Sequence, residues 1–227
     1  MNINQNLNSI MKTLNQYIQE KLIINKDYRE AKIVVKSSDE LRKIIKDRYD
    51  KLGPGTKQNP INFNDIDVSN LDSFYSQTTY TGIFERTKFK YIDISDWDVS
   101  NVKSMHYMFS DCEELESVGD ISKWDLSNVT DMSWMFCKCE ELESVRYISK
   151  WNVSKVTDMS YMFAFYKKFN QDISGWDVSN VTNMDYMFYK CESFNQDISN
   201  WDVSKVKQRT YMFYNCPIKD EYKPKFK

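Results

Sequence analysis

Apolar residues recur in one fixed pattern through most of the chain. Tryptophan stands at Trp97, Trp124, Trp151, Trp176 and Trp201, separated by 27, 27, 25 and 25 residues. Each tryptophan opens a phrase of the type Trp-Asp-Val-Ser-Asn-Val, and Met-Phe follows eleven residues after it. A degenerate copy that starts at Ile66 makes six copies. Self-similarity at such a period is the signature of a repeat architecture.

The apolar positions of one copy predict a strand followed by a short helix. Around Trp176 they are Ile173, Trp176, Val178, Val181, Met184, Met187, Phe188 and Cys191. The first four have the spacing of the leucine-rich strand signature, and the later ones step by three and four, as on one helix face. Neither element buries its apolar side alone, so the copies are expected to stack. The sequence therefore predicts an α/β fold, a curved leucine-rich-repeat-like solenoid of about six turns of 25–27 residues.

Two repeated phrases resemble a known family. Residues 169–184 read FNQDISGWDVSNVTNM, and residues 194–201 read FNQDISNW. These phrases resemble the BspA-like leucine-rich-repeat proteins, whose repeat is often described as a bacterial lipoprotein-associated domain of unknown function. The resemblance covers about residues 63–216. It implies a solenoid with a binding or adhesive role, often at a bacterial surface, and it supplies no catalytic residue.

The two ends of the chain have patterns of their own. Apolar residues at helical spacing predict an amphipathic helix over residues 1–24, and residues 31–36 predict a strand. Ser37 is placed to cap a helix that runs through Leu52 and ends at Gly53. We therefore expect an N-terminal helix and strand–helix cap over residues 1–60, the repeat solenoid over 61–216 and a closing tail over 217–227.

Charge is distributed unevenly. Residues 1–60 carry 12 Lys/Arg and 7 Asp/Glu (net +5), residues 61–216 carry 15 and 24 (net −9), and the tail carries 4 and 2 (net +2). An acidic body disfavours nucleic acid as a partner, and no run of 18 apolar residues predicts a membrane span. The N-terminal residues lack a basic run followed by an apolar stretch, so we expect no secretory signal. The five cysteines are an odd number, which without a signal is typical of reduced thiols. These features predict a cytoplasmic location, or the cell surface if a signal has been removed.

Residues suited to catalysis are scarce. His106 is the only histidine, and the equivalent positions of the other copies hold Ser133, Ser160, Asp185 and Thr210. A Ser-His-Asp or Cys-His site needs a histidine, whereas a position that accepts so many side chains is typical of an exposed polar residue. No glycine-rich phosphate loop is present. We expect no enzyme activity, no cofactor and no metal site.

Four cysteines share one repeat position: Cys112, Cys139, Cys191 and Cys216. Stacking spreads them along the column, so they do not converge as metal ligands would. The favoured interpretation is a column of small buried residues. A disulfide between Cys112 and Cys139 is the alternative under oxidising conditions.

Polar residues around each tryptophan form the first candidate binding surface. The residues that follow the tryptophans are Asp98, Asp125, Asn152, Asp177 and Asp202. The residues that precede them are Asp96, Lys123, Lys150, Gly175 and Asn200. In a leucine-rich strand such side chains border the concave surface. Two roles stay open: an acidic concave strip for a basic partner or a divalent cation, or hydrogen bonds with nearby serines that satisfy turn backbone groups.

A row of aromatic residues is the second candidate surface. Ten residues after each tryptophan stand Tyr107, Trp134, Tyr161, Tyr186 and Tyr211. Exposed aromatic side chains often anchor protein partners, and stacking between repeats is the alternative role. The sequence favours a non-catalytic protein–protein interaction solenoid that uses the acidic strip, with this row second. The alternatives are a bacterial surface adhesin or host-contact protein and a cation-binding structural solenoid.

Overall fold

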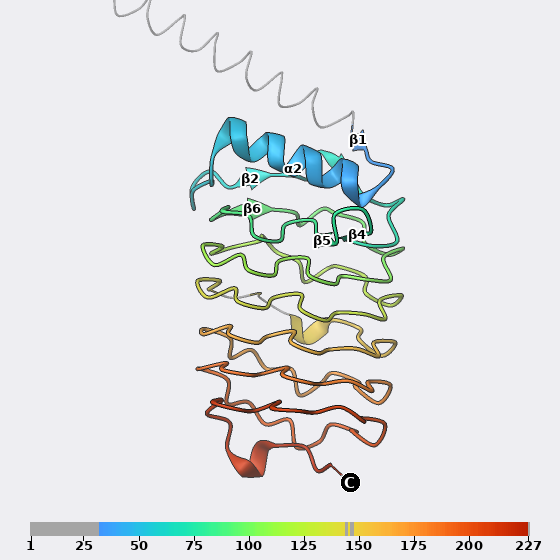
Figure 1. Ribbon diagram of the computed structural model, residues 1–227, viewed down its shortest axis with the longest axis vertical. Coiled ribbons are helices and arrows are strands. Elements are labelled where there is room, and N and C mark those ends of the chain that lie inside the picture. The colour runs from blue at the N-terminus through green and yellow to red at the C-terminus, as the bar shows by residue number, and fades with distance from the viewer. Residues whose placement is uncertain (1–31, 144, 146–147, 227) are drawn as a thin grey trace, which may run out of the picture.

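The structure is a computed structural model that describes residues 32–143, 145 and 148–226. These residues form a column of chain layers stacked along the long axis (Figure 1). The helix expected over residues 1–24 lies outside the described part of the chain.

The α/β solenoid with a strand and a helix in each copy is wrong. Among the described residues the only α-helix is α2 (Ser38–Leu52), which precedes the repeats. The other helical elements are the 3-10 turns η1 (Ile148–Lys150) and η2 (Asp220–Tyr222). The repeats consist mainly of turns and coil. Therefore neither the expected helix ending in Met-Phe nor the expected strand through each tryptophan forms.

The strands are short and lie toward the N-terminal end. They are β1 (Ile33–Val34), β2 (Ile61–Asn62), β3 (Ile66–Asp67), β4 (Tyr75–Ser76), β5 (Thr81–Gly82) and β6 (Ile92–Asp93). β1 pairs with β3 and β2 with β6, both in parallel, and β4 pairs with β5 as an antiparallel hairpin. From there on, successive copies are joined by single parallel bridges, such as Asp131 with Asp158 and Asp158 with Asn183.

Main-chain hydrogen bonds between layers replace the expected helix. The N–H of Met105 donates to the carbonyl of Asp131 at 2.9 Å, and that of Phe109 donates to Met135 at 2.9 Å. Alternate residues repeat this pattern in the four inner copies, and these donors all point toward the layer that follows in sequence. A helix would direct the same groups to carbonyls four residues back. The apolar steps of three and four occur here because successive reverse turns also place every third or fourth side chain inward.

Left-handed backbone at two positions of each copy makes this arrangement possible. The non-glycine residues with positive φ are Tyr80, Arg86, Tyr107, Asp111, Trp134, Lys138, Tyr161, Phe165, Tyr186, Lys190, Tyr211 and Asn215. In Tyr161 and Phe165, for example, φ is 57° and 59°. Such a φ ends an α-helix. It costs a side chain of this size about 1 kcal/mol or more, which the bonds between layers must offset.

Columns of identical side chains fill the interior. The rings of Phe109 and Phe136 stack at 5.4 Å between centroids, and those of Trp124 and Trp151 stack at 6.4 Å. These side chains are buried, and complete burial of one phenylalanine contributes about 1.5–3 kcal/mol. The indole N–H of Trp176 also donates to the carbonyl of Ile148 in the preceding layer at 2.9 Å. The positions that the apolar period assigns to the core are therefore the buried ones.

Each end of the column is closed by a different segment. The predicted helix is confirmed in α2: the Ser37 hydroxyl accepts from the N–H of Glu40, and Gly53 follows with φ 74°. α2 lies across one end, and the tail with η2 lies at the other (Figure 1). Ile218 of this tail is buried, and the carbonyl of Tyr222 accepts from the N–H of Ile198 at 3.0 Å. The predicted domain boundaries are compatible with this arrangement and stay a prediction.

Replacement of Gly82 by alanine is expected to destabilise the protein. A Cβ atom at this position would lie 2.0 Å from the carbonyl oxygen of Tyr107, so the backbone of two layers must separate. We expect a loss of about 1–3 kcal/mol, measured as a lower midpoint of urea unfolding.

Gly175→Ala is the matched control, because a Cβ there meets nothing within 4 Å. It should be neutral, or stabilise by about 0.4–1 kcal/mol through the unfolded state. Equal midpoints for the two variants would contradict the close approach at Gly82.

Candidate functional site

The aspartates after each tryptophan lie in exposed turns. Exposed members of this aspartate column are Asp98, Asp125, Asp177 and Asp202, with Asn152 in the remaining layer. Each side-chain oxygen Oδ1 accepts from the main-chain N–H of the serine two residues later, at 2.9 Å for Asp125 and 3.0 Å for Asp177. The amide oxygen of Asn152 accepts the same bond at 3.2 Å. The turn-forming role that the sequence left open is therefore present, and the carboxylates remain at the surface.

These turn bonds favour the ionised carboxylate. The main-chain N–H and the hydroxyl of Ser127 hold the pKa of Asp125 below its ordinary value. The hydroxyl and main-chain N–H of Ser179 do the same for the pKa of Asp177, against the repulsion of Asp202 in the next layer. Bonds to the charged form of an acid stabilise that form. Asp125 and Asp177 therefore carry negative charge at neutral pH.

The residues that precede each tryptophan are exposed in the same way. They are Asp96, Lys123, Lys150, Gly175 and Asn200. The amide of Asn200 donates to the carbonyl of Ser174 at 3.0 Å, and the N–H of Asp96 donates to Asn64 at 2.9 Å. These positions therefore take part in turns as well as in the surface. The strand that was to align them along a concave strip does not form.

The aromatic row forms one stack of rings. Ring centroids lie 5.2 Å apart between Tyr107 and Trp134, 3.8 Å between Trp134 and Tyr161, and 4.5 Å between Tyr161 and Tyr186. Interplanar angles of 24°, 11° and 10° show that the faces of these half-buried rings cover one another. Only ring edges remain for a partner along the inner row.

The last layer differs, because its aromatic rings lack a further neighbour. Tyr211 is 57% exposed and Tyr214 is 49% exposed. Tyr186 and Tyr189, which hold the same positions one layer earlier, are half-buried. A stacking ligand or partner would therefore find open ring area at the C-terminal end of the row.

His106 lies beside a serine and an aspartate without forming a catalytic triad. Its Nδ1 lies 2.6 Å from the hydroxyl of Ser133 and 4.0 Å from the carboxylate of Asp131. The hydroxyl of Ser133 itself donates to Asp131. A triad requires serine and aspartate on opposite ring nitrogens, whereas both are here on the same one. This arrangement therefore differs from a Ser-His-Asp triad.

Three members of the cysteine column, Cys112, Cys139 and Cys191, are buried, and Cys216 is half-buried. All five cysteines are free thiols, so the alternative disulfide between Cys112 and Cys139 is not formed. The thiol of Cys112 donates to the carbonyl of Phe84 at 3.0 Å, and that of Cys139 donates to Phe109 at 3.1 Å. Each thiol thus serves as a hydrogen-bond donor to the preceding layer.

The described part of the chain has neither a cluster of metal-ligating side chains nor a helix suited to a membrane. No group of three or more His, Cys, Asp or Glu side chains that could hold a metal ion occurs there. None of its helices has the length and hydrophobicity that a bilayer crossing requires.

Sequence reasoning missed a column of charged residues near the aromatic row. Lys138 Nζ lies 2.7 Å from a carboxylate oxygen of Asp111, and Arg86 Nε lies 3.7 Å from the other. All three have left-handed backbone. No residue type marks this conformation here, because arginine, aspartate and lysine hold a position that glycine usually takes. Only the repeat period, which places these three residues at equivalent positions of successive copies, could have revealed the column.

Comparison with known proteins identifies one family. The family model described as "Mycoplasma protein of unknown function, DUF285" matches residues 56–146 and again residues 115–223. No curated protein and no solved structure matches the chain. The match agrees with the expected bacterial repeat family of unknown function. The narrower BspA-like assignment is not confirmed by it.

Acid is expected to destabilise the protein in part through the aspartate turns. Because the folded-state pKa values of Asp125 and Asp177 are lowered, their stabilisation is complete above the unfolded pKa of about 3.9. It is lost as the pH falls through the lower folded values. Thermal midpoints between about pH 6 and pH 3 should therefore fall less steeply in an Asp125→Asn, Asp177→Asn variant than in the wild type. An equal or steeper fall would contradict the role of these bonds.

The thiols are expected to differ in reactivity. Burial raises the pKa of Cys112 and of Cys137 to about 12 and holds that of Cys139 well above its ordinary value. Cys216 is only half-buried, although burial raises its pKa as well. Iodoacetamide should therefore modify Cys216 first in the folded protein, and the others only on unfolding. Mass spectrometry of a time course tests this order, and early modification of Cys112 would overturn it.

Proposed function

The chain belongs to this DUF285 family of unknown function, and from that premise we propose a non-catalytic binding module that holds a basic segment of a protein partner on its aspartate column. The observation that carries the proposal is the placement of Asp98, Asp125 and Asp177. Each is exposed in an equivalent turn of its own layer. A lysine- or arginine-rich segment therefore contacts aspartate carboxylates that all lie in the same type of turn.

The repeat explains why such a surface is suited to binding. The turn bonds immobilise each carboxylate before a partner arrives, so little side-chain entropy is lost on association. Exposed charges act mainly on the association rate and on specificity. Binding by this column should therefore weaken as salt is added, since the charges are screened within about 8 Å at physiological ionic strength.

The aromatic row is the second part of the proposal. Its inner members Trp134, Tyr161 and Tyr186 offer ring edges, whereas Tyr211 offers an open ring at one end. We assign the row a supporting role, because its ring faces, with which an aromatic residue would contact a partner, already stack on the rings of neighbouring layers.

Neutralisation of the column is expected to weaken partner binding. The variant is Asp98→Asn, Asp125→Asn, Asp177→Asn, which should fold because Asn152 makes the same turn bond in the native chain. Three surface charges worth about 0.5 kcal/mol each predict about a tenfold higher Kd. The measurement is capture from native lysate with quantitative mass spectrometry, followed by titration of the captured partner and of a polylysine peptide at two salt concentrations.

The matched control is Asp120→Asn, Asp172→Asn, Asp197→Asn. These aspartates accept the same serine N–H bonds at 2.9–3.0 Å in turns on the other side of each tryptophan in sequence. Net charge and turn chemistry change equally in both variants. Equal loss of binding would show that net charge alone acts, and full binding by the first variant would overturn the proposed site.

A further inference from the structure

The two ends of the column expose different main-chain groups. In every inner layer, four alternate N–H groups donate to the layer that follows. In the fifth copy they are Met184, Tyr186, Phe188 and Lys190, which donate at 2.8–3.0 Å to Gln208, Thr210, Met212 and Tyr214. Along this stretch of each copy the column therefore has a carbonyl edge at its N-terminal end and an N–H edge at its C-terminal end, whereas Thr157, Thr182 and Lys207 beside it donate to the preceding layer.

The carbonyl edge is occupied by donors from the cap. The hydroxyl of Ser38 donates to the carbonyl of Ser73 at 2.6 Å. The guanidinium of Arg42 donates to the carbonyl of Gly82. Both donors belong to the first half of α2. The hydroxyl thus satisfies a main-chain oxygen that has no preceding layer, and the cation adds a second donor to the carbonyl of Gly82, which also accepts from the N–H of Glu85 at 3.2 Å.

The N–H edge has no such cap. The equivalent donors in the last copy are Arg209, Tyr211, Phe213 and Asn215, and their N–H groups make no hydrogen bond within the described part of the chain. The tail covers the apolar end of the core with Ile218 and Pro224. It reaches this edge only with side chains: Phe226 lies 4.6 Å from the guanidinium of Arg209, and Lys223 lies 5.8 Å from the ring of Phe213. The edge is therefore left open although the core is closed.

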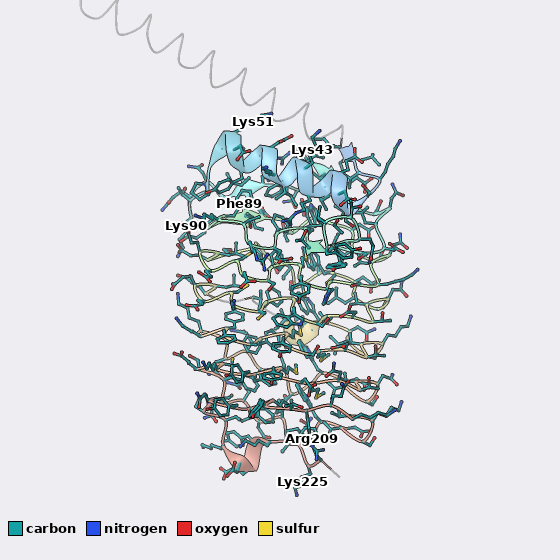
Figure 2. The ribbon with its side chains drawn as sticks, in the orientation of Figure 1. Lys43, Lys51, Phe89, Lys90, Arg209 and Lys225 are labelled. Carbon is teal, nitrogen blue, oxygen red and sulfur yellow. The ribbon has the colours of Figure 1, made fainter. Side chains whose placement is uncertain are left out.

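The C-terminal end of the column has a net positive charge, and the hydrogens of its exposed N–H groups carry a partial positive charge as well. Residues 203–227 carry 7 Lys/Arg and 2 Asp/Glu, a net of +5. Figure 2 shows Arg209 and Lys225 at this end and Lys43 and Lys51 at the opposite end. Residues 32–60 at that opposite end carry 8 Lys/Arg and 4 Asp/Glu, a net of +4. Stacking of two copies end to end would bring like charges together, and α2 already occupies the carbonyl edge that such a contact needs.

We propose that the C-terminal edge, residues 207–215, binds an acidic peptide segment of another protein. Alternate carbonyl groups of the segment accept from the four N–H groups, as the next layer would. Its carboxylates lie near Lys207 and Arg209, and Tyr211 and Tyr214 supply open ring area. Successive N–H groups that face one way also favour negative charge. Donors two residues apart require a segment of about seven or eight residues. The inference concerns a different surface from the aspartate column and does not depend on it.

The test uses the full chain and two peptides of eight residues, alternating Glu-Thr and alternating Lys-Thr. Fluorescence anisotropy should show binding of the Glu-Thr peptide and at least tenfold weaker binding of the Lys-Thr peptide. Lys207→Glu with Arg209→Glu should weaken the Glu-Thr complex at least tenfold. Lys43→Glu with Lys51→Glu, which makes the same charge change at the other end, should leave it unchanged. Equal loss in both variants, or no binding of the acidic peptide, overturns the proposal.

Amide exchange followed by NMR tests the main-chain contact without any substitution. In the free protein the N–H groups of Arg209, Tyr211, Phe213 and Asn215 should exchange fast, and their equivalents in the fifth copy slowly. The Glu-Thr peptide should slow the four edge amides at least tenfold. Binding of the peptide without this protection would show that charge alone holds it, and would overturn the proposed main-chain hydrogen bonds. Protection that rises with protein concentration in the absence of peptide would assign the edge to a second copy instead.

Discussion

Main-chain hydrogen bonds between successive layers are the interaction on which the rest of the structure depends. Reverse turns leave half of their N–H groups without partners inside the turn, and an unpaired buried N–H costs about 1–3 kcal/mol. The layer that follows supplies carbonyls at the same height, as in the bond from Tyr161 to Asp185 at 2.8 Å. Successive layers must therefore keep one register, so that each residue lies next to the equivalent residue of the neighbouring copy.

That register produces both the core and the surface. It aligns Phe136 with Phe163 and Trp151 with Trp176 in the interior. By the same rule it aligns exposed aspartates in the turns and half-buried tyrosines along the aromatic row. Turn bonds from serine fix the carboxylates, so the surface charges are held as firmly as the backbone that carries them. Stacked repeats present an extended surface of this kind without a cleft.

The direction of the bonds also makes the column polar. Carbonyl groups meet the cap at one end, where Ser38 and Arg42 supply donors, and N–H groups meet solvent at the other. A helix has the same asymmetry on a smaller scale, with its N–H groups at the N-terminus. Basic residues therefore have different roles at the two ends. At the N-terminal end Arg42 donates to a carbonyl oxygen, and at the C-terminal end basic residues add to the positive potential of the N–H groups.

Several features of the fold and the candidate site could be predicted from the sequence. The repeat, its phase, the buried positions and the helix capped by Ser37 follow from residue type and spacing, because burial and capping select particular side chains. The same holds for the serine bonds to Asp125 and Asp177. The short helix expected along Val181, Met184, Met187, Phe188 and Cys191 was wrong for a physical reason: reverse turns and a helix bury apolar side chains at the same steps of three and four.

The sequence by itself therefore determined which side chains lie inside, where the copies begin, and which charges they carry outward. Only the tertiary structure decided where each peptide N–H finds its acceptor. Every residue offers the same N–H and carbonyl groups, so the choice between a helix and a neighbouring layer is not encoded by side-chain pattern. It depends on whether the next copy is present to accept, as at Tyr186, or absent, as at Tyr211.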